Sequence, residues 1–228
     1  MIESREELKI SALYRDPSRS LAFPWLAQFV YPWEALDGIG AFIRELGARL
    51  PDSEYEQREK EVWVARDAKI APTASLFGPC IVGKEAEIRP GAFIRGSVLI
   101  GAGAVVGNST ELKNCILFDG VQVPHYNYVG DSILGYRAHM GAGAITSNVK
   151  SDKTPVTVAV ASERLETGRK KMGAMLGDFV EVGCNSVLNP GTVIGANSTV
   201  YPLSSVRGFV PADCIYKSKD QIVKKRQS

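Results

Sequence analysis

The two histidines of this chain, His125 and His139, both lie between residues 123 and 148, in the segment VPHYNYVGDSILGYRAHMGAGAITSN. Histidine is the side chain whose ordinary pKa lets it gain and lose a proton near neutral pH. A positioned histidine therefore suits reactions in which a general base takes a proton from a nucleophile. The rest of the chain must then supply a scaffold that holds this segment in place.

A six-residue repeat organises most of the chain from residue 64 onward. A period of six fits neither a 3.6-residue helix nor an alternating strand. It is typical of the hexapeptide β-helix, in which each unit forms one short strand and one turn. The repeat therefore predicts an all-β fold, a parallel β-helix with an interior ladder of apolar side chains. Ten apolar residues stand in register: Val64, Ile70, Leu76, Val82, Ile88, Ile94, Ile100, Val106, Leu112 and Phe118.

The repeat is interrupted twice before it ends. Its register slips after Phe118, because Pro124 stands where the next apolar residue is due, and the period restarts at Leu134. It resumes at Leu176 beyond a largely polar stretch, so we expect an extruded loop near residues 148–172. The last residues, KSKDQIVKKRQS, are expected to form a basic, solvated C-terminal tail.

Residues 1–60 differ in kind from the repeats and predict a helical N-terminal appendage, which leaves residues 61–228 for the β-helix. Pro32 suits the first turn of a helix, where its missing N–H would be unpaired in any case. An appendage of this size has too small a core to fold alone. We expect it to pack on the solenoid or on a neighbouring subunit. Four apolar residues recur at helical spacing: Leu36, Ile39, Ile43 and Leu46.

Composition indicates an ordinary soluble protein. Hydrophobic residues make up 45% and charged residues 23%, and the formal net charge is +2. So mild a charge gives no reason to expect nucleic acid or a membrane surface as a partner. No run approaches the ~18 apolar residues of a membrane span, and MIESREELKI lacks the apolar core of a signal peptide. The 4 cysteines show no CxxC pair and no metal spacing, so we expect reduced thiols, no bound metal and a cytoplasmic location.

The segment around the histidines resembles a known family. HYNYVGDSILG followed by MGAGAITSN is similar to the acetyltransferase β-helix of the bifunctional glucosamine-1-phosphate acetyltransferase/N-acetylglucosamine-1-phosphate uridylyltransferases. It is more similar still to the C-terminal half of the archaeal sugar-1-phosphate nucleotidylyltransferase/acetyltransferases, where ETGRKKMGAMLGDFVEVG and NPGTVIG also have near counterparts. The resemblance covers about residues 62–217. It implies a left-handed parallel β-helix, assembled as a homotrimer with shared active sites, that uses acetyl-CoA to acetylate an amino-sugar phosphate such as glucosamine 1-phosphate.

The nucleotidylyltransferase half of such proteins has no counterpart here. That half opens with a glycine-rich GGxGTR-type loop, which this sequence does not contain, although YPWEAL resembles the segment that joins the two halves. We therefore expect no nucleotidyl transfer by this chain. The alternative to the enzyme is a non-catalytic β-helix that binds a sugar nucleotide or docks with a separate nucleotidylyltransferase. A β-helical carbonic anhydrase would need three histidines on zinc, and the chain has 2.

The resemblance implies roles for five residues at matching positions. His125, in H-x-x-Y-x-G-D, matches the catalytic base, and Asn148 matches an asparagine near the acceptor amine. Arg89, in IRPGA, and Lys113, in ELKN, match positions that hold the sugar phosphate. Arginine can bind phosphate through two parallel hydrogen bonds, whereas lysine acts as a point charge. Tyr128 matches a tyrosine that contacts the sugar. Each residue also has an ordinary structural explanation. His125 could be a histidine that is hydrogen-bonded at a turn, and Arg89 and Lys113 could be solvated surface charges. Tyr128 could pack in the core or at a subunit contact, and Asn148 could simply begin a loop.

Five further positions follow from the same resemblance. His139 stands where the glucosamine-1-phosphate enzymes have an asparagine that contacts the acceptor, which leaves open a changed sugar preference, a second acid/base group or a tolerated replacement. Ala142 matches a position whose backbone N–H faces the thioester, where such donors stabilise an oxyanion. Cys184 and Pro202 match small residues along the pantetheine arm of acetyl-CoA, and Lys217 matches a basic residue near the CoA phosphate.

Overall fold

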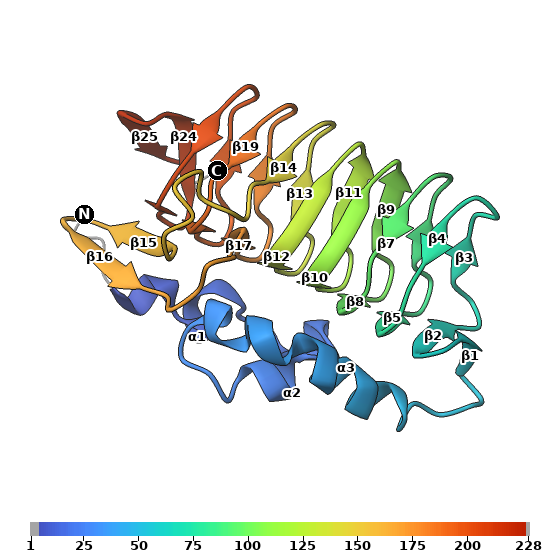
Figure 1. The fold of residues 1–228 in the computed structure, drawn as a ribbon. Coiled ribbons are helices and arrows are strands. Elements are labelled where there is room, and N and C mark those ends of the chain that lie inside the picture. The colour runs from blue at the N-terminus through green and yellow to red at the C-terminus, as the bar shows by residue number, and fades with distance from the viewer. Residues whose placement is uncertain (1–4, 227–228) are drawn as a thin grey trace.

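The computed structural model describes residues 5–226, which form a three-sided parallel β-helix with helices along one side (Figure 1). Each coil contributes one short strand to each of three faces. The first face carries β2 (Val62–Ala65), β5 (Cys80–Val82), β8 (Val98–Ile100), the ends of β10 (Glu111–Leu117) and β12 (Tyr128–Leu134), β17 (Ala174–Leu176), β20 (Thr192–Ile194) and β23 (Phe209–Val210). The predicted parallel β-helix is thus confirmed.

The other two faces complete each coil. The second face carries β3 (Lys69–Ile70), β6 (Glu87–Ile88), β9 (Val105–Asn108), β11 (Gln122–His125), β13 (His139–Met140), β18 (Glu181–Val182), β21 (Thr199–Val200) and β24 (Cys214–Ser218). The third face carries β4 (Ser75–Leu76), β7 (Phe93–Ile94), the beginnings of β10 and β12, β14 (Ile145–Thr146), β19 (Val187–Leu188) and β22 (Ser205–Val206).

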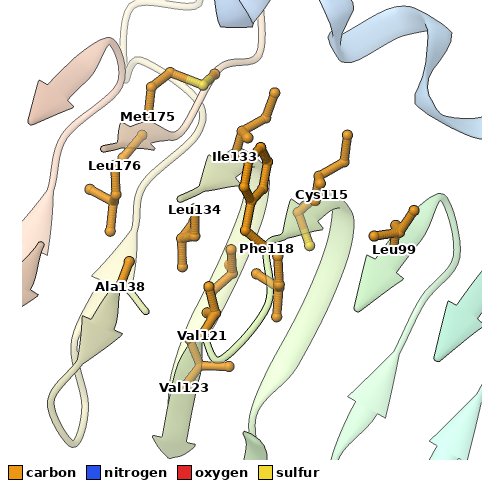
Figure 2. Close-up of a cluster of buried hydrophobic side chains, with 14 of the residues drawn as sticks. Leu99, Cys115, Phe118, Val121, Val123, Ile133, Leu134, Ala138, Met175 and Leu176 are labelled. Atoms are coloured by element: carbon orange, nitrogen blue, oxygen red, sulfur yellow. The ribbon is translucent and has the colours of Figure 1, made fainter. Parts of the chain in front are cut away.

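The repeat residues point inward and fill the solenoid, as the six-residue period predicts. Val82, Ile100 and Leu134 are fully buried, and Figure 2 shows such side chains meeting between the faces. Burial of an aliphatic side chain contributes about 1.5–3 kcal/mol, so the ladder supplies the main stabilisation. Three of the cysteines, Cys80, Cys115 and Cys214, are buried in this core, whereas Cys184 is exposed.

Two successive coils are one residue shorter than the 18-residue coils that precede them, which explains the slip in the repeat. Val82 pairs with Ile100, a coil of 18 residues, but Ile100 pairs with Leu117 and Leu117 with Leu134, which gives coils of 17. The missing residue comes from the corner between the third and first faces. There β10 and β12 continue across the corner, with Asn114 and Asp131 in the left-handed region at φ 49° each.

The N-terminal appendage packs along the first face, where Figure 1 shows it beside the solenoid. Its helices are η1 (Arg5–Leu8), α1 (Ile10–Leu13), η2 (Pro17–Arg19), α2 (Phe23–Leu26), η3 (Pro32–Gly38) and α3 (Ile39–Gly47). Leu36, Ile39 and Ile43 are buried against the coils. Asp178 anchors the appendage, because its carboxylate accepts from the backbone N–H groups of Arg15 and Tyr136, each at 2.8 Å. No helix within residues 5–226 has the length and apolarity of a membrane span.

Three antiparallel pairs depart from the coils. β1 (Tyr55–Glu59) pairs with β2 at the start of the solenoid. The insert near residues 148–172, expected as an extruded loop, contains the hairpin β15 (Thr157–Val160) and β16 (Glu163–Glu166). Its alternate valines, Val156, Val158 and Val160, are buried, so hydrophobic burial holds it to the molecule. The tail, expected to be solvated, pairs β24 with β25 (Gln221–Lys224), while Gln227 and Ser228 lie outside the described residues.

Candidate active site

Four of the predicted residues lie in one row along the edge between the second and third faces. The strand registers place His125 beside Ala142, Ala142 beside Cys184 and Cys184 beside Pro202 on successive coils. Backbone hydrogen bonds connect the same turns, because Gly143 N–H donates to the His125 carbonyl at 3.0 Å and Asn185 N–H to that of Ala142 at 2.8 Å. We call this row, His125–Ala142–Cys184–Pro202, the histidine edge.

The histidine edge presents the groups that acyl transfer requires. The imidazole of His125 is exposed and makes no hydrogen bond to any residue between 5 and 226, while its backbone N–H donates to Asn127 Oδ1 at 3.1 Å. The backbone N–H of Ala142 likewise donates to no group in the described chain. A free imidazole next to a free N–H can serve as a general base and an oxyanion donor.

The far end of the histidine edge carries a thiol and a cation. Cys184 and Pro202 are both exposed. The register of β21 and β24 places Lys217 beside Tyr201, which precedes Pro202, and Lys217 Nζ lies 5.8 Å from the centre of the Tyr201 ring. Since neighbouring coils are about 4.8 Å apart, the row from His125 to Pro202 spans roughly 14 Å. An extended ligand with an anionic end fits such a row.

A buried carboxylate organises the other predicted residues at the corner between the third and first faces. Asp131 is 5% exposed in its side chain and accepts from Lys113 Nζ at 3.0 and 3.2 Å. It also accepts from Asn114 Nδ2 at 2.9 Å and Asn148 Nδ2 at 2.5 Å. Asn148 Nδ2 further donates to the Tyr128 hydroxyl at 3.2 Å. We call these five residues the aspartate cluster.

Tyr128 remains a neutral phenol in the aspartate cluster. Burial, then the Asp131 and Glu111 carboxylates, raise the pKa of its hydroxyl. A neutral hydroxyl can donate to a ligand oxygen while it accepts from Asn148. Sequence reasoning placed Lys113, Tyr128 and Asn148 in the site but assigned nothing to Asp131 and Asn114, although Asp131 closes the H-x-x-Y-x-G-D motif.

Arg89 and Lys113, the two residues predicted to bind the sugar phosphate, do not lie close together within one chain. Arg89 follows β6 on the second face, where its Nε bonds to Glu87 at 2.9 Å, and it lies on the side of the histidine edge. The arginine that neighbours Lys113 is Arg95, because Phe93 and Ile94 of β7 pair with Glu111 and Leu112 of β10. Arg95 stands 18 residues, or one full coil, before Lys113. The spacing of the repeat could therefore have identified Arg95 as the neighbour of Lys113, whereas the IRPGA motif pointed to Arg89.

His139 lies apart from His125 on the second face. It is in register with Gln122, at the opposite end of β11 from His125. Its Nδ1 lies 2.7 Å from Glu181 Oε2 on the next coil. Three residues of strand, about 10 Å, separate the two histidines along this face, so one chain does not bring them together.

The histidine edge and the aspartate cluster also occupy different corners of the coil. The segment Tyr128–Gly130 of β12 crosses the third face between them. A cavity of about 480 Å³ beside the cluster is lined by Lys113, Asn114 and Asp131 but not by His125. Within one chain, therefore, the free imidazole and the lysine open onto separate surfaces.

A family model matches residues 76–193, more than half of the chain, and is described as the GMPPB C-terminal domain. Among curated relatives, the bifunctional sugar-1-phosphate nucleotidylyltransferase/acetyltransferase of Sulfurisphaera tokodaii is 38% identical over 42% of this chain and 24% of its own. The bifunctional protein GlmU of Methanococcus maripaludis is 35% identical over 54% of this chain and 30% of its own. The chain thus spans about a quarter to a third of these relatives.

Solved structures resemble the β-helix more distantly. The acetyltransferase domain of PglB from Neisseria gonorrhoeae, in complex with acetyl coenzyme A, is 16% identical with a TM-score of 0.36, over 71% of this chain and 56% of that one.

Proposed function

Because the chain belongs to the GMPPB C-terminal domain family, we propose that it is an acetyl-CoA-dependent N-acetyltransferase that acts on an amino-sugar phosphate such as glucosamine 1-phosphate. The observation that carries this proposal is the histidine edge, in which a free imidazole, a free backbone N–H and an exposed row toward Lys217 lie in line. The match of the bifunctional sugar-1-phosphate nucleotidylyltransferase/acetyltransferase of Sulfurisphaera tokodaii supports it. Nucleotidyl transfer is not part of the proposal.

In the proposed reaction, the amine of the acceptor attacks the thioester carbonyl of acetyl-CoA. Its nitrogen forms a bond to the acetyl carbon as His125 takes a proton from that nitrogen, and the Ala142 N–H donates to the oxyanion of the tetrahedral intermediate. The carbon–sulfur bond then breaks, and the proton passes to the leaving CoA thiolate. A positioned base typically contributes about 10²–10⁴-fold, and one oxyanion donor about 10²–10³-fold.

The acceptor is proposed to lie against the aspartate cluster of a second chain. Lys113 and Arg95 would hold its phosphate, while Tyr128 and Asn148 would contact the sugar. Since His125 and Lys113 open onto separate surfaces of one chain, a trimer in which one chain supplies the histidine edge and its neighbour the cluster completes the site. Cyclic assemblies commonly build sites in this way from two surfaces of the same chain.

The deciding experiment is a thiol-release assay with acetyl-CoA against a panel of amino-sugar 1-phosphates. Turnover on one sugar, with the acetylated product identified by mass spectrometry, would establish the transfer and name the acceptor. A folded protein that turns over none of them but binds a sugar nucleotide would replace this proposal with the non-catalytic binding module.

Cys184 offers a chemical test of the acetyl-CoA surface. Burial raises the pKa of the Cys80 thiol to about 12 and also raises that of Cys115, and buried thiols react slowly because the thiolate is the nucleophile. We expect iodoacetamide to alkylate Cys184 first, and saturating acetyl-CoA to slow this labelling about tenfold or more. Peptide mass spectrometry measures both. Labelling of Cys184 at the same rate with and without acetyl-CoA would place the cofactor elsewhere.

A further inference from the structure

A polar cavity lies where three separate parts of the chain meet. Its volume is about 480 Å³, and its walls are Leu36–Asp37 at the end of η3, the Lys113–Asn114 corner with Asp131, and Gly168–Lys171, where the insert returns to the solenoid. The appendage and the insert therefore shape a space beside the aspartate cluster that the β-helix alone does not enclose.

Arg169 lines this cavity, and one of its N–H donors makes no hydrogen bond within the described residues. Its side chain is 14% exposed, its Nη1 lies 2.5 Å from Asp37 Oδ1, and its Nη2 donates to the Glu34 carbonyl at 2.8 Å. Its Nε is buried without a hydrogen-bond partner in the described chain. Buried donors are nearly always paired with a protein group, water or a ligand. The orphaned Nε is closed to solvent here, so an acceptor atom in the cavity can reach it only when the guanidinium moves away from Asp37.

The charges around the cavity favour an anion. Lys113 is matched by Asp131 and Arg169 by Asp37. Lys170 and Lys171 are exposed and form no ion pair with any residue from 5 to 226. Two cations are thus left unbalanced at the wall. A phosphate monoester carries nearly two negative charges and three strong acceptor oxygens, which suits a guanidinium donor flanked by two lysines.

We propose that this cavity is a phosphate site in which Arg169 Nε donates to the ligand, Lys170 and Lys171 neutralise it, and Asp37 on the helical appendage competes with it for Arg169. Identifying the ligand as the phosphate of the acceptor rests on the proposed function, in which Lys113 of the same cavity also contacts that phosphate. The anion site itself does not rest on it. Asp37 is 88% exposed in its side chain, so it can leave the guanidinium when a stronger anion arrives. The appendage would then set the affinity of the site.

The test is calorimetric titration of the full chain with inorganic phosphate and with pyrophosphate, in the absence of acetyl-CoA. We expect Arg169→Gln to weaken binding roughly 10- to 100-fold, as loss of a charged hydrogen-bond donor does. The double variant Lys170→Ala/Lys171→Ala should weaken it about tenfold and flatten its salt dependence, since salt screens such exposed charges. Arg164→Gln, in β16 of the same insert, is the matched control and should bind as the parent does.

Asp37→Asn separates a competing carboxylate from a merely structural ion pair. If Asp37 competes with the ligand, the variant should bind phosphate about two- to fivefold more tightly, because exposed ion pairs have modest energies. Weaker binding in Asp37→Asn, or equal binding in Arg169→Gln and Arg164→Gln, would overturn the proposal. Should Arg169→Gln fail to fold, the lysine pair and Asp37→Asn still decide it. Phosphate binding without acetyl transfer would refute the proposed function alone, and transfer without phosphate binding would refute this site alone.

Discussion

His125→Ala is expected to lower kcat for acetyl transfer by about 10²–10⁴-fold, the usual contribution of a general base. The imidazole is exposed and makes no hydrogen bond to a residue between 5 and 226, so its loss should leave the melting temperature and the KM for acetyl-CoA nearly unchanged. Thiol release measures kcat and KM, and thermal denaturation measures stability. Lys69→Ala is the control, because Lys69 is exposed on the same face but lies three coils away from β11 and the histidine edge.

The same variant tests whether two chains share one site. Asn148→Ala should also lose activity, because it removes an amide from the aspartate cluster. When equal amounts of the two inactive chains are denatured and reassembled together, random assembly should restore about one quarter of the sites, those that take His125 from one chain and Asn148 from its neighbour. Mixing that restores no activity, while each variant alone still forms trimers, would mean that a single chain supplies both residues.

The solenoid could be predicted well from the sequence because each six-residue unit of the repeat corresponds to one strand and one turn of a coil. Each apolar residue of the period faces inward, so the position of Val82 fixes that of Ile100 one coil later. The slip at Pro124 was also visible in the sequence. The slip arises from a corner shortened by one residue, which brings Asp131 against Lys113. How β10 and β12 cross that corner cannot be read from a linear pattern.

Three other features of the structure differ from the sequence-based predictions, because they depend on contacts between residues that are distant in the chain or on local strand pairing. Arg89 was chosen by a short motif, whereas the coil spacing places Arg95 beside Lys113. The insert was expected to be a loop because it is polar overall, but its alternating valines form a hairpin with a buried side. Arg169 had no role in the sequence analysis, because its partners Asp37 and Glu34 lie far away along the chain.

Gly107→Ala is expected to destabilise the protein by about 3 kcal/mol or more, the upper range for overpacking. A Cβ atom on residue 107 would overlap the carbonyl group of Pro124 on the next coil, and the parallel ladder prevents either backbone from moving away alone. For a chain of this size, that loss corresponds to a fall in melting temperature of roughly 6–12 °C, measurable by circular dichroism.

Gly103→Ala is the control for this prediction, because residue 103 has a φ of +63° but open space around its missing Cβ. It should cost about 1–2 kcal/mol, the ordinary penalty of the left-handed region.

The Gly107→Ala and Gly103→Ala variants should also differ in activity. Pro124 immediately precedes His125, so displacing it moves the imidazole, and displacements of about 1 Å can cost 10²-fold in rate. Gly107→Ala should therefore lose kcat at temperatures where it remains folded, and Gly103→Ala should keep it. Equal melting temperatures and equal kcat in the two variants would show that the close contact between residues 107 and 124 does not hold His125 in place.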